Sequence, residues 1–212
     1  MNPAPLPGPP EDHTVLVEFP LLDEERLPEV LFRVHRLDHD PQWFAATGDG
    51  RFDPPVGAAA QFGTCYLAVD PVTAMMEAFG DLPVVTQQMV DARALAVVHL
   101  AQPHKLADMT SPLIVGRWKL DRRISTGDDY SVCQRWAHSL RLAGFAGIYY
   151  EPRHDPRGEI QPASVALFAD PGLQPQTMVL ADDSPIPAEV VATTKEAFGL
   201  RVLPRATLPP PR

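Results

Sequence analysis

Residues 64–80 read Thr64-Cys-Tyr-Leu-Ala-Val-Asp-Pro-Val-Thr-Ala-Met-Met-Glu-Ala-Phe-Gly80, and this stretch predicts a strand that passes directly into a helix. The run from 64 to 69 is uncharged and mostly apolar, which is typical of a short buried strand. Asp70 followed by Pro71 is a strong helix start, because the Asp side chain accepts hydrogen bonds from the first free N–H groups and proline suits the first helical position. Gly80 is a natural helix end.

The predicted helix has one ionisable residue, Glu77, beside an apolar stripe made of Val72, Met75, Met76 and Phe79. On an isolated amphipathic helix, such a glutamate is most simply a solvated residue of the outer face. The alternative is a carboxylate held in apolar surroundings for chemistry, because perturbed carboxylates cluster at functional sites. The segments upstream favour the second interpretation.

Two arginine-bearing segments precede the strand. Val30–Arg36 alternates like a strand, with Leu31, Arg33 and His35 on one face and Val30, Phe32 and Val34 on the other. Arg33 is therefore expected to point away from the apolar face. Gly48-Asp-Gly-Arg51-Phe52-Asp-Pro-Pro55 is a glycine-flanked turn within a long loop from Asp38 to Gly63. Glycines let backbone N–H groups approach a phosphate and Arg51 can bind one bidentately, although an ordinary Asp-Gly turn looks the same.

These elements together resemble the RES domain family. The family pattern has an early Arg, a Gly-Gly-Arg-Trp-like loop, a Tyr on a strand and an Ala-x-x-Glu-like helix, which correspond here to Arg33, the Arg51 loop, Tyr66 and Ala74-Met-Met-Glu77. Gly144-Phe-Ala-Gly-Ile-Tyr-Tyr150 and Val165-Ala-Leu-Phe168 are similar to its C-terminal half. The resemblance covers about residues 30–170. Characterised members are toxins of toxin–antitoxin pairs that degrade NAD⁺.

The resemblance implies an α+β fold, with a strongly bent mixed sheet and flanking helices, similar to the ADP-ribosyltransferase toxins. The sequence agrees in lacking a Gly-x-Gly-x-x-Gly that opens a helix after a strand, so a Rossmann domain is not expected. We expect a Pro-rich extension over 1–28, a RES-like domain over 29–170 and a C-terminal appendage with a Pro-rich tail over 171–212. The appendage either packs on the domain or serves a partner.

The implied activity is cleavage of the N-glycosidic bond between nicotinamide and ribose in NAD⁺, by phosphorolysis or hydrolysis. Glu77 is then expected to stabilise the positive charge that grows on the ribose. The Tyr66 ring would stack on nicotinamide, or its hydroxyl would reach the ribose. Arg33 and Arg51 would hold the pyrophosphate, with Arg33 also in the catalytic set and Phe52 beside the substrate. The acceptor stays open between water, inorganic phosphate and a protein side chain, and no metal or further cofactor is expected.

One departure from the family pattern leaves alternatives open. The family commonly has a Ser in the loop after its Gly-Ile-Tyr-Tyr-like strand, whereas this chain has Glu151-Pro-Arg-His154. Arg153 contacting the pyrophosphate, or Ser164 entering the pocket, would compensate. The alternatives are a partner-binding protein with impaired catalysis and an ADP-ribosyltransferase that acts on a protein. The family also implies an Xre-type antitoxin partner, and a homo-oligomer stays open.

Composition narrows the class further. The net charge of −9, from 27 acidic against 18 basic residues, disfavours direct nucleic-acid binding, which needs a basic face. No apolar run is long enough to cross a membrane, and the N-terminus lacks the pattern of a signal peptide, so a cytoplasmic location is expected. Cys65 and Cys133 are expected to be reduced core residues. A zinc site at His35 and His39, with His154 as a third ligand, is disfavoured because no compact motif supports it.

The remaining elements follow from periodicity and end signals. A helix starting at Asp128 or Asp129 and running through Leu142 is the clearest, because its apolar residues keep helical spacing. Strands are expected at 13–19, 94–100, 105–109, 146–150, 163–169, 177–180 and 200–203. Shorter helices are expected at 84–91 and 187–198.

Overall fold

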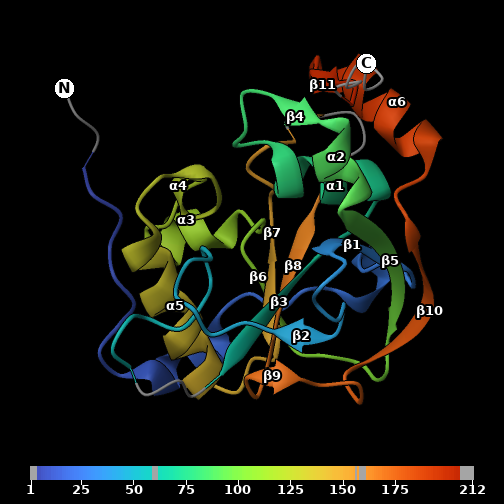
Figure 1. The fold of residues 1–212 in the computed structure, drawn as a ribbon. Coiled ribbons are helices and arrows are strands. Elements are labelled where there is room, and N and C mark those ends of the chain that lie inside the picture. The colour runs from blue at the N-terminus through green and yellow to red at the C-terminus, as the bar shows by residue number, and fades with distance from the viewer. Residues whose placement is uncertain (1–3, 59–61, 156, 158–160, 206–212) are drawn as a thin grey trace, which may run out of the picture.

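The computed structural model describes residues 4–58, 62–155, 157 and 161–205, and its centre is a mixed sheet (Figure 1). Within these residues the sheet has seven strands in the order β10-β5-β1-β3-β8-β7-β6. The strands are β1 (Leu31–Arg36), β3 (Gly63–Ala68), β5 (Arg93–Leu100), β6 (Leu106–Asp108), β7 (Gly147–Tyr150), β8 (Ser164–Ala169) and β10 (Met178–Pro185). Within this sheet, as far as the structure describes it, β6 and β7 are the only parallel neighbours. The predicted α+β class with a mixed sheet is confirmed.

Two groups of helices flank this sheet, α3–α5 on the left of Figure 1 and α1, α2 and α6 at its upper right. The helices are α1 (Pro71–Phe79), α2 (Gln87–Asp91), α3 (Leu113–Trp118), α4 (Arg123–Thr126), α5 (Tyr130–Leu142) and α6 (Ala188–Phe198). Two 3₁₀ helices, η1 (His13–Glu18) and η2 (Glu24–Arg26), precede β1. Two small ladders pair β2 (Trp43–Phe44) with β9 (Gly172–Leu173) and β4 (Val85–Thr86) with β11 (Val202–Leu203).

The sheet consists of two halves that meet at β1 and β3. β1 pairs with β5 along its whole length and β3 pairs with β8 in the same way, whereas β1 and β3 share one register pair, Phe32 with Ala68. On one face of the sheet, the α3–α5 group packs on β7 and β8 around Trp136. On the same face, the α1 group packs on β1 and β5 around Met75. The two helix groups therefore leave the β1–β3 junction between them, and a site can form there.

The strand-turn-helix at 64–80 has its predicted form. The backbone of β3 is buried between β1 and β8. Asp70 caps α1, because its Oδ1 accepts from the backbone N–H groups of Val72 and Thr73 at 3.0 Å each. Asp129 likewise caps α5 by accepting from Ser131 N. These local signals therefore fix the two helices that border the site.

Two segments differ from prediction. Residues 13–18 form η1 and not an edge strand, because Leu16 and Phe19 are buried at a spacing of one helical turn while the alternate residue Val17 is 62% exposed. Asp12 caps η1 by accepting from Thr14 N. The segment predicted as a helix at 84–91 begins with β4, and the helix starts only at Gln87.

Residues beyond 170 add to the same sheet. β10 forms an antiparallel edge strand along β5, and α6 packs against α1. Cys65 and Cys133 are free and buried, as predicted. Among the described helices, none is long and apolar enough to cross a membrane.

Candidate active site

A cavity of about 320 Å³ lies on the sheet face between the two helix groups, above the junction of β1 and β3. Its wall includes five of the residues singled out from the sequence, namely Arg33, Arg51, Tyr66, Glu77 and Arg153. They come from β1, the long loop before β3, β3 itself, α1 and the loop after β7. The fold thus brings together residues that are far apart in the chain.

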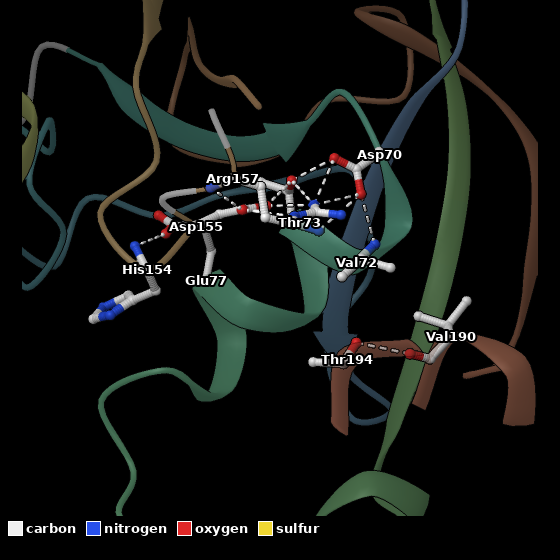
Figure 2. A network of polar contacts seen from close by, with 9 residues as sticks. All are labelled: Asp70, Val72, Thr73, Glu77, His154, Asp155, Arg157, Val190 and Thr194. Carbon is white, nitrogen blue, oxygen red and sulfur yellow. Dashed lines mark hydrogen bonds and ion pairs between the residues drawn. The ribbon is translucent and has the colours of Figure 1, made fainter. Parts of the chain in front are cut away.

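Glu77 lies in the cavity wall on α1, with its carboxylate toward the loop after β7. Its Oε1 accepts a hydrogen bond of 3.0 Å from the backbone N–H of His154 (Figure 2). Burial raises the pKa of Glu77, and the His154 N–H and the nearby Arg51 charge oppose that rise. The neighbouring Tyr150 hydroxyl is buried, and burial together with the Glu77 charge raises its pKa. Glu77 is therefore a partly desolvated carboxylate held by a neutral donor.

Arg51 carries an unsatisfied buried donor in the wall of the same cavity. The residue is only 6% exposed, and its Nη1 donates to Gly127 O at 2.7 Å. Its guanidinium lies over the Tyr130 ring, 4.5 Å from the centroid. Its Nη2 is buried and has no hydrogen-bond partner among the described residues. Because an unpaired buried donor is costly, this group is suited to an anionic oxygen of a ligand.

The loop that carries Arg51 is held by Tyr66 and Asp53. The Tyr66 hydroxyl donates to Asp53 Oδ1 and accepts from Phe52 N, both at 2.9 Å. Asp53 Oδ2 also accepts from Gly50 N at 3.0 Å, and burial raises the pKa of Asp53. A Cβ on Gly50 would lie 2.4 Å from the Tyr66 hydroxyl, so this close approach needs glycine. The Tyr66 hydroxyl therefore holds the loop, rather than being free for a ribose as one of its predicted roles requires.

Arg33 borders the cavity, but its guanidinium lies elsewhere. Its Nη1 donates to Pro41 O at 2.7 Å and to Cys65 Sγ at 2.6 Å. Cys65 packs with Leu31 on the face opposite Tyr66, because successive strand residues point to opposite sides. The predicted alternation of β1 is correct. The cavity, however, opens on the face of Phe32 and Val34, so the guanidinium ties β1 to the following loop.

Phe52 does not reach the cavity wall, although it was expected beside the substrate. It is fully buried and packs edge-on against the Tyr150 ring, with centroids 4.9 Å apart. The backbone of this loop turns after Arg51, so the two neighbouring side chains diverge. Phe52 is therefore a core residue that packs behind the wall residue Tyr150.

The loop after β7 contributes Arg153 and His154. Arg153 Nη2 donates to Asp128 Oδ1 at 2.7 Å at the cavity rim. The His154 imidazole turns away from Glu77 (Figure 2) and its Nε2 lies 3.3 Å from Asp81 Oδ1. A Cβ on Gly80 would be 2.4 Å from His154 Cγ, so Gly80 admits this ring in addition to following the helix. His154 was not among the predicted site residues.

Ser164 occupies the wall at the start of β8, directly opposite Tyr150 in the β7–β8 register. Its Oγ is buried and has no hydrogen-bond partner of good geometry within the part of the chain that the structure describes. The hydroxyl lies beside that of Tyr150, so Ser164 adds a second buried donor to the cavity wall. This is the position that the sequence offered as a substitute for the missing family Ser.

The histidines considered for zinc are occupied otherwise. His35 Nε2 lies 2.8 Å from Asp183 Oδ1 on β10, and its Nδ1 lies 2.9 Å from His39 O. Over residues 4–58, 62–155, 157 and 161–205, no group of three or more His, Cys, Asp or Glu side chains is arranged to hold a metal ion. His35 joins the edge strand to the sheet.

Comparisons with known proteins place this arrangement in a family. A crystal structure of the M. tuberculosis MbcT–MbcA toxin–antitoxin complex contains a chain of similar fold, with a TM-score of 0.60, 18% sequence identity, and coverage of 81% of this chain and 89% of that one. No curated protein matches the sequence. The model of the RES domain matches residues 30–187, which is well over half of the chain. The chain therefore belongs to the RES domain family.

Proposed function

We propose that this protein degrades NAD⁺ by breaking the N-glycosidic bond between nicotinamide and ribose, and that it is the toxin of a toxin–antitoxin pair. The observation that supports this most directly is the pairing, in one cavity, of the partly desolvated Glu77 carboxylate with the unpartnered Nη2 of Arg51. The Glu77 carboxylate suits a developing cation, and the Arg51 guanidinium suits an anion. NAD⁺ offers both, a cationic nicotinamide ribose and a pyrophosphate.

The proposed chemistry needs a carboxylate and little else. As the C1′–N bond breaks, its electron pair moves to the nicotinamide nitrogen, which loses its positive charge, and the ribose becomes oxocarbenium-like. Glu77 stabilises that charge across the cavity, where low polarity strengthens the interaction. An acceptor oxygen then bonds to C1′ and gives up its proton. Water and inorganic phosphate are both acceptable as that oxygen.

Phosphate recognition falls to Arg51 and Arg153, with Ser164 as a neutral donor. Arg51 is held in place by Gly127 O and the Tyr130 ring, so its guanidinium is pre-organised. Arg153 forms an ion pair with Asp128 at the rim of the cavity. The unpartnered Ser164 hydroxyl in the cavity wall supports an active enzyme over a partner-binding protein that has lost catalysis. We do not assign the pyrophosphate to Arg33, because its guanidinium is committed to Cys65 and Pro41.

Nicotinamide release from NAD⁺ by the purified protein tests the proposal. Reactions run with and without inorganic phosphate, and the ribosyl product is identified by mass, which separates phosphorolysis from hydrolysis. A parallel reaction with labelled NAD⁺ and cell extract detects transfer to proteins. Absence of nicotinamide release under all three conditions would refute the enzymatic proposal.

Replacing Arg153 by Ala is expected to raise the KM for NAD⁺ about tenfold and to leave most of kcat. The reason is that a ground-state contact to phosphate is lost while Glu77 stays in place. Arg122→Ala is the control, since Arg122 is an exposed arginine that pairs with Glu151 outside the cavity wall. Equal KM values for the two variants would remove Arg153 from the substrate site.

We further propose an antitoxin partner of the Xre type that covers the cavity entrance and contacts the loop from Asp38 to Gly63. The similarity to a chain of a toxin–antitoxin complex supports a partner in general. Expression of the chain alone is expected to arrest growth and deplete cellular NAD⁺, and co-expression with the protein encoded next to it is expected to restore growth. An active enzyme that accumulates to high level without harm would count against toxicity.

A further inference from the structure

A partly buried polar network joins α1 to the loop after β7, and the chemistry proposed above does not use it. We call it the latch, and its side chains are Asp70, Thr73, Asp155 and Arg157 (Figure 2). Arg157 Nε donates to Asp155 Oδ1 at 2.7 Å, and its Nη2 donates to Thr73 Oγ1 at 3.1 Å and to Asp70 Oδ1 at 3.2 Å. Thr73 Oγ1 lies 2.6 Å from Asp155 Oδ2 and also contacts Asp70 Oδ2, so its one proton serves either carboxylate.

The latch is charged, and its two central side chains are hidden from solvent, whereas Arg157 and Asp70 are 20% and 30% exposed. The Asp155 side chain has no exposed surface and Thr73 is fully buried. Burial alone raises the pKa of Asp155, but the hydrogen bonds from Arg157 and Thr73 outweigh that effect, and its pKa is lowered overall. A buried ion pair adds little net stability compared with well-packed apolar residues. Its distinctive property is that it fixes one geometry, because each donor must meet its acceptor.

The latch is connected to Glu77 through α1 and through the loop after β7. Thr73 and Glu77 are four residues apart on α1, and therefore lie on the same side of the helix. Their partners in the loop, Asp155 and the His154 N–H, are consecutive in the chain. Two successive loop residues are thus tied to two successive turns of one helix face.

We propose that Thr73 and Asp155 are positioning residues, which hold the loop after β7 so that the His154 N–H stays on the Glu77 carboxylate in its catalytic orientation. This inference rests on the proposed function. It assigns the latch a role in turnover in addition to its contribution to stability. Neither residue lines the cavity, so neither is a catalytic residue.

The test compares Thr73→Val, which keeps shape and removes the hydroxyl, with Thr73→Ser, which keeps the hydroxyl. Thr194→Val is the matched control, because Thr194 is also fully buried in a helix, and among the described residues its hydroxyl donates only within its own helix, to Val190 O (Figure 2). Thr73→Val is expected to lower kcat for nicotinamide release about ten- to hundredfold with little change in KM, because the reacting geometry loosens while phosphate contacts stay. Thr73→Ser and Thr194→Val are expected to keep the parent kcat.

A second readout does not require activity. Titration of the Glu77 carboxyl by NMR is expected to give a higher pKa in Thr73→Val than in the parent, because the His154 N–H bond lowers that pKa. The other charged groups that face Glu77 are Arg51 and the His154 ring, which favour its ionised form, and Asp155, which opposes it. Tyr150 also faces Glu77, but burial and the Glu77 charge raise the pKa of Tyr150, so it stays neutral while Glu77 titrates. Arg51, the His154 ring and Tyr150 keep their partners in all variants, and Asp155 belongs to the latch itself, so a difference between Thr73→Val and Thr194→Val reports the latch.

The outcomes are separable. Parent activity together with equal kcat and equal Glu77 titration in Thr73→Val and Thr194→Val would overturn the latch and leave the proposed function standing. An inactive parent would refute the function, and the titration would still decide whether the latch positions Glu77. If Thr73→Val does not fold, Arg157→Gln serves in the same two measurements, because it removes the guanidinium that joins Asp70 to Asp155.

Discussion

Replacement of Glu77 by Gln is expected to reduce the rate of nicotinamide release at least about a hundredfold while the fold is retained. Gln keeps the volume of the side chain and an oxygen that can accept from the His154 N–H, and it removes only the negative charge. A charge aimed at an oxocarbenium-like transition state contributes several kcal/mol, of which about 2.7 kcal/mol corresponds to a hundredfold. Nicotinamide release at saturating NAD⁺ measures the effect.

The same variant is expected to be more stable than the parent near pH 7. Since the pKa of Glu77 is raised above 4.5 in the folded state, that state binds the proton more tightly than the unfolded state does. Stability from this group is therefore greatest below pH 4.5 and falls as pH rises through the raised pKa. Removing the charge is expected to recover about 1 kcal/mol, or about 2–4 °C in Tm.

Glu29→Gln is the control for both measurements, because Glu29 is an almost fully exposed glutamate outside the cavity wall. It is expected to change neither turnover nor Tm. If Glu77→Gln turns over NAD⁺ as Glu29→Gln does, Glu77 is not the group that stabilises the ribose cation.

Replacement of Arg51 by Met is expected to raise the KM for NAD⁺ about ten- to hundredfold, with a smaller fall in kcat. Met preserves much of the packing against Tyr130 but removes the Nη2 that has no partner within the protein. A hydrogen bond between a guanidinium and a phosphate contributes about 1.5–3 kcal/mol, which sets this range. The KM of Arg51→Lys is expected to lie between those of the parent and Arg51→Met, because lysine keeps the charge and loses the planar arrangement of N–H donors.

Arg93→Met is the matched control for Arg51. The Arg93 guanidinium also lies 4.5 Å from an aromatic centroid, that of Phe79, but Arg93 is outside the cavity wall. Its KM is expected to equal that of the parent. Thermal unfolding checks that each variant is folded at the assay temperature. A KM for Arg51→Met no higher than that of Arg93→Met would mean that the open donor does not meet substrate.

The elements that the sequence predicts well are those whose signals are local. β3, α1 and α5 combine an apolar run or stripe with a capping carboxylate, and the caps at Asp70 and Asp129 are made as expected. The prediction of a strand at 13–19 is wrong, although Val15-Leu16-Val17 is a short apolar run rich in β-branched residues, which favours a strand. The core instead takes Leu16 and Phe19, a choice made by the helices and strands around them.

For the site residues as well, the sequence predicts what depends on local pattern and misses what depends on tertiary packing. The pattern of β1 correctly separates Arg33 from Phe32, yet which side holds the cavity depends on where the helix groups pack. Asp53 was overlooked, although a carboxylate between Phe52 and a proline in a glycine-rich turn is a signal that the loop folds back on itself. The latch pairs residues more than 80 positions apart, and a single sequence carries no sign of such contacts.

The order in which the cavity wall is synthesised has a consequence for a chain proposed to be toxic. The wall begins with Phe32 on β1 and ends with Ser164 on β8. At typical translation speeds, about 4–17 s separate the synthesis of Glu77 from that of Ser164. During that interval β3 has no β8 to pair with, so the nascent chain holds its carboxylate in an incomplete pocket. The topology therefore delays the appearance of activity until most of the protein has been made, which gives a partner present in the same cell a head start.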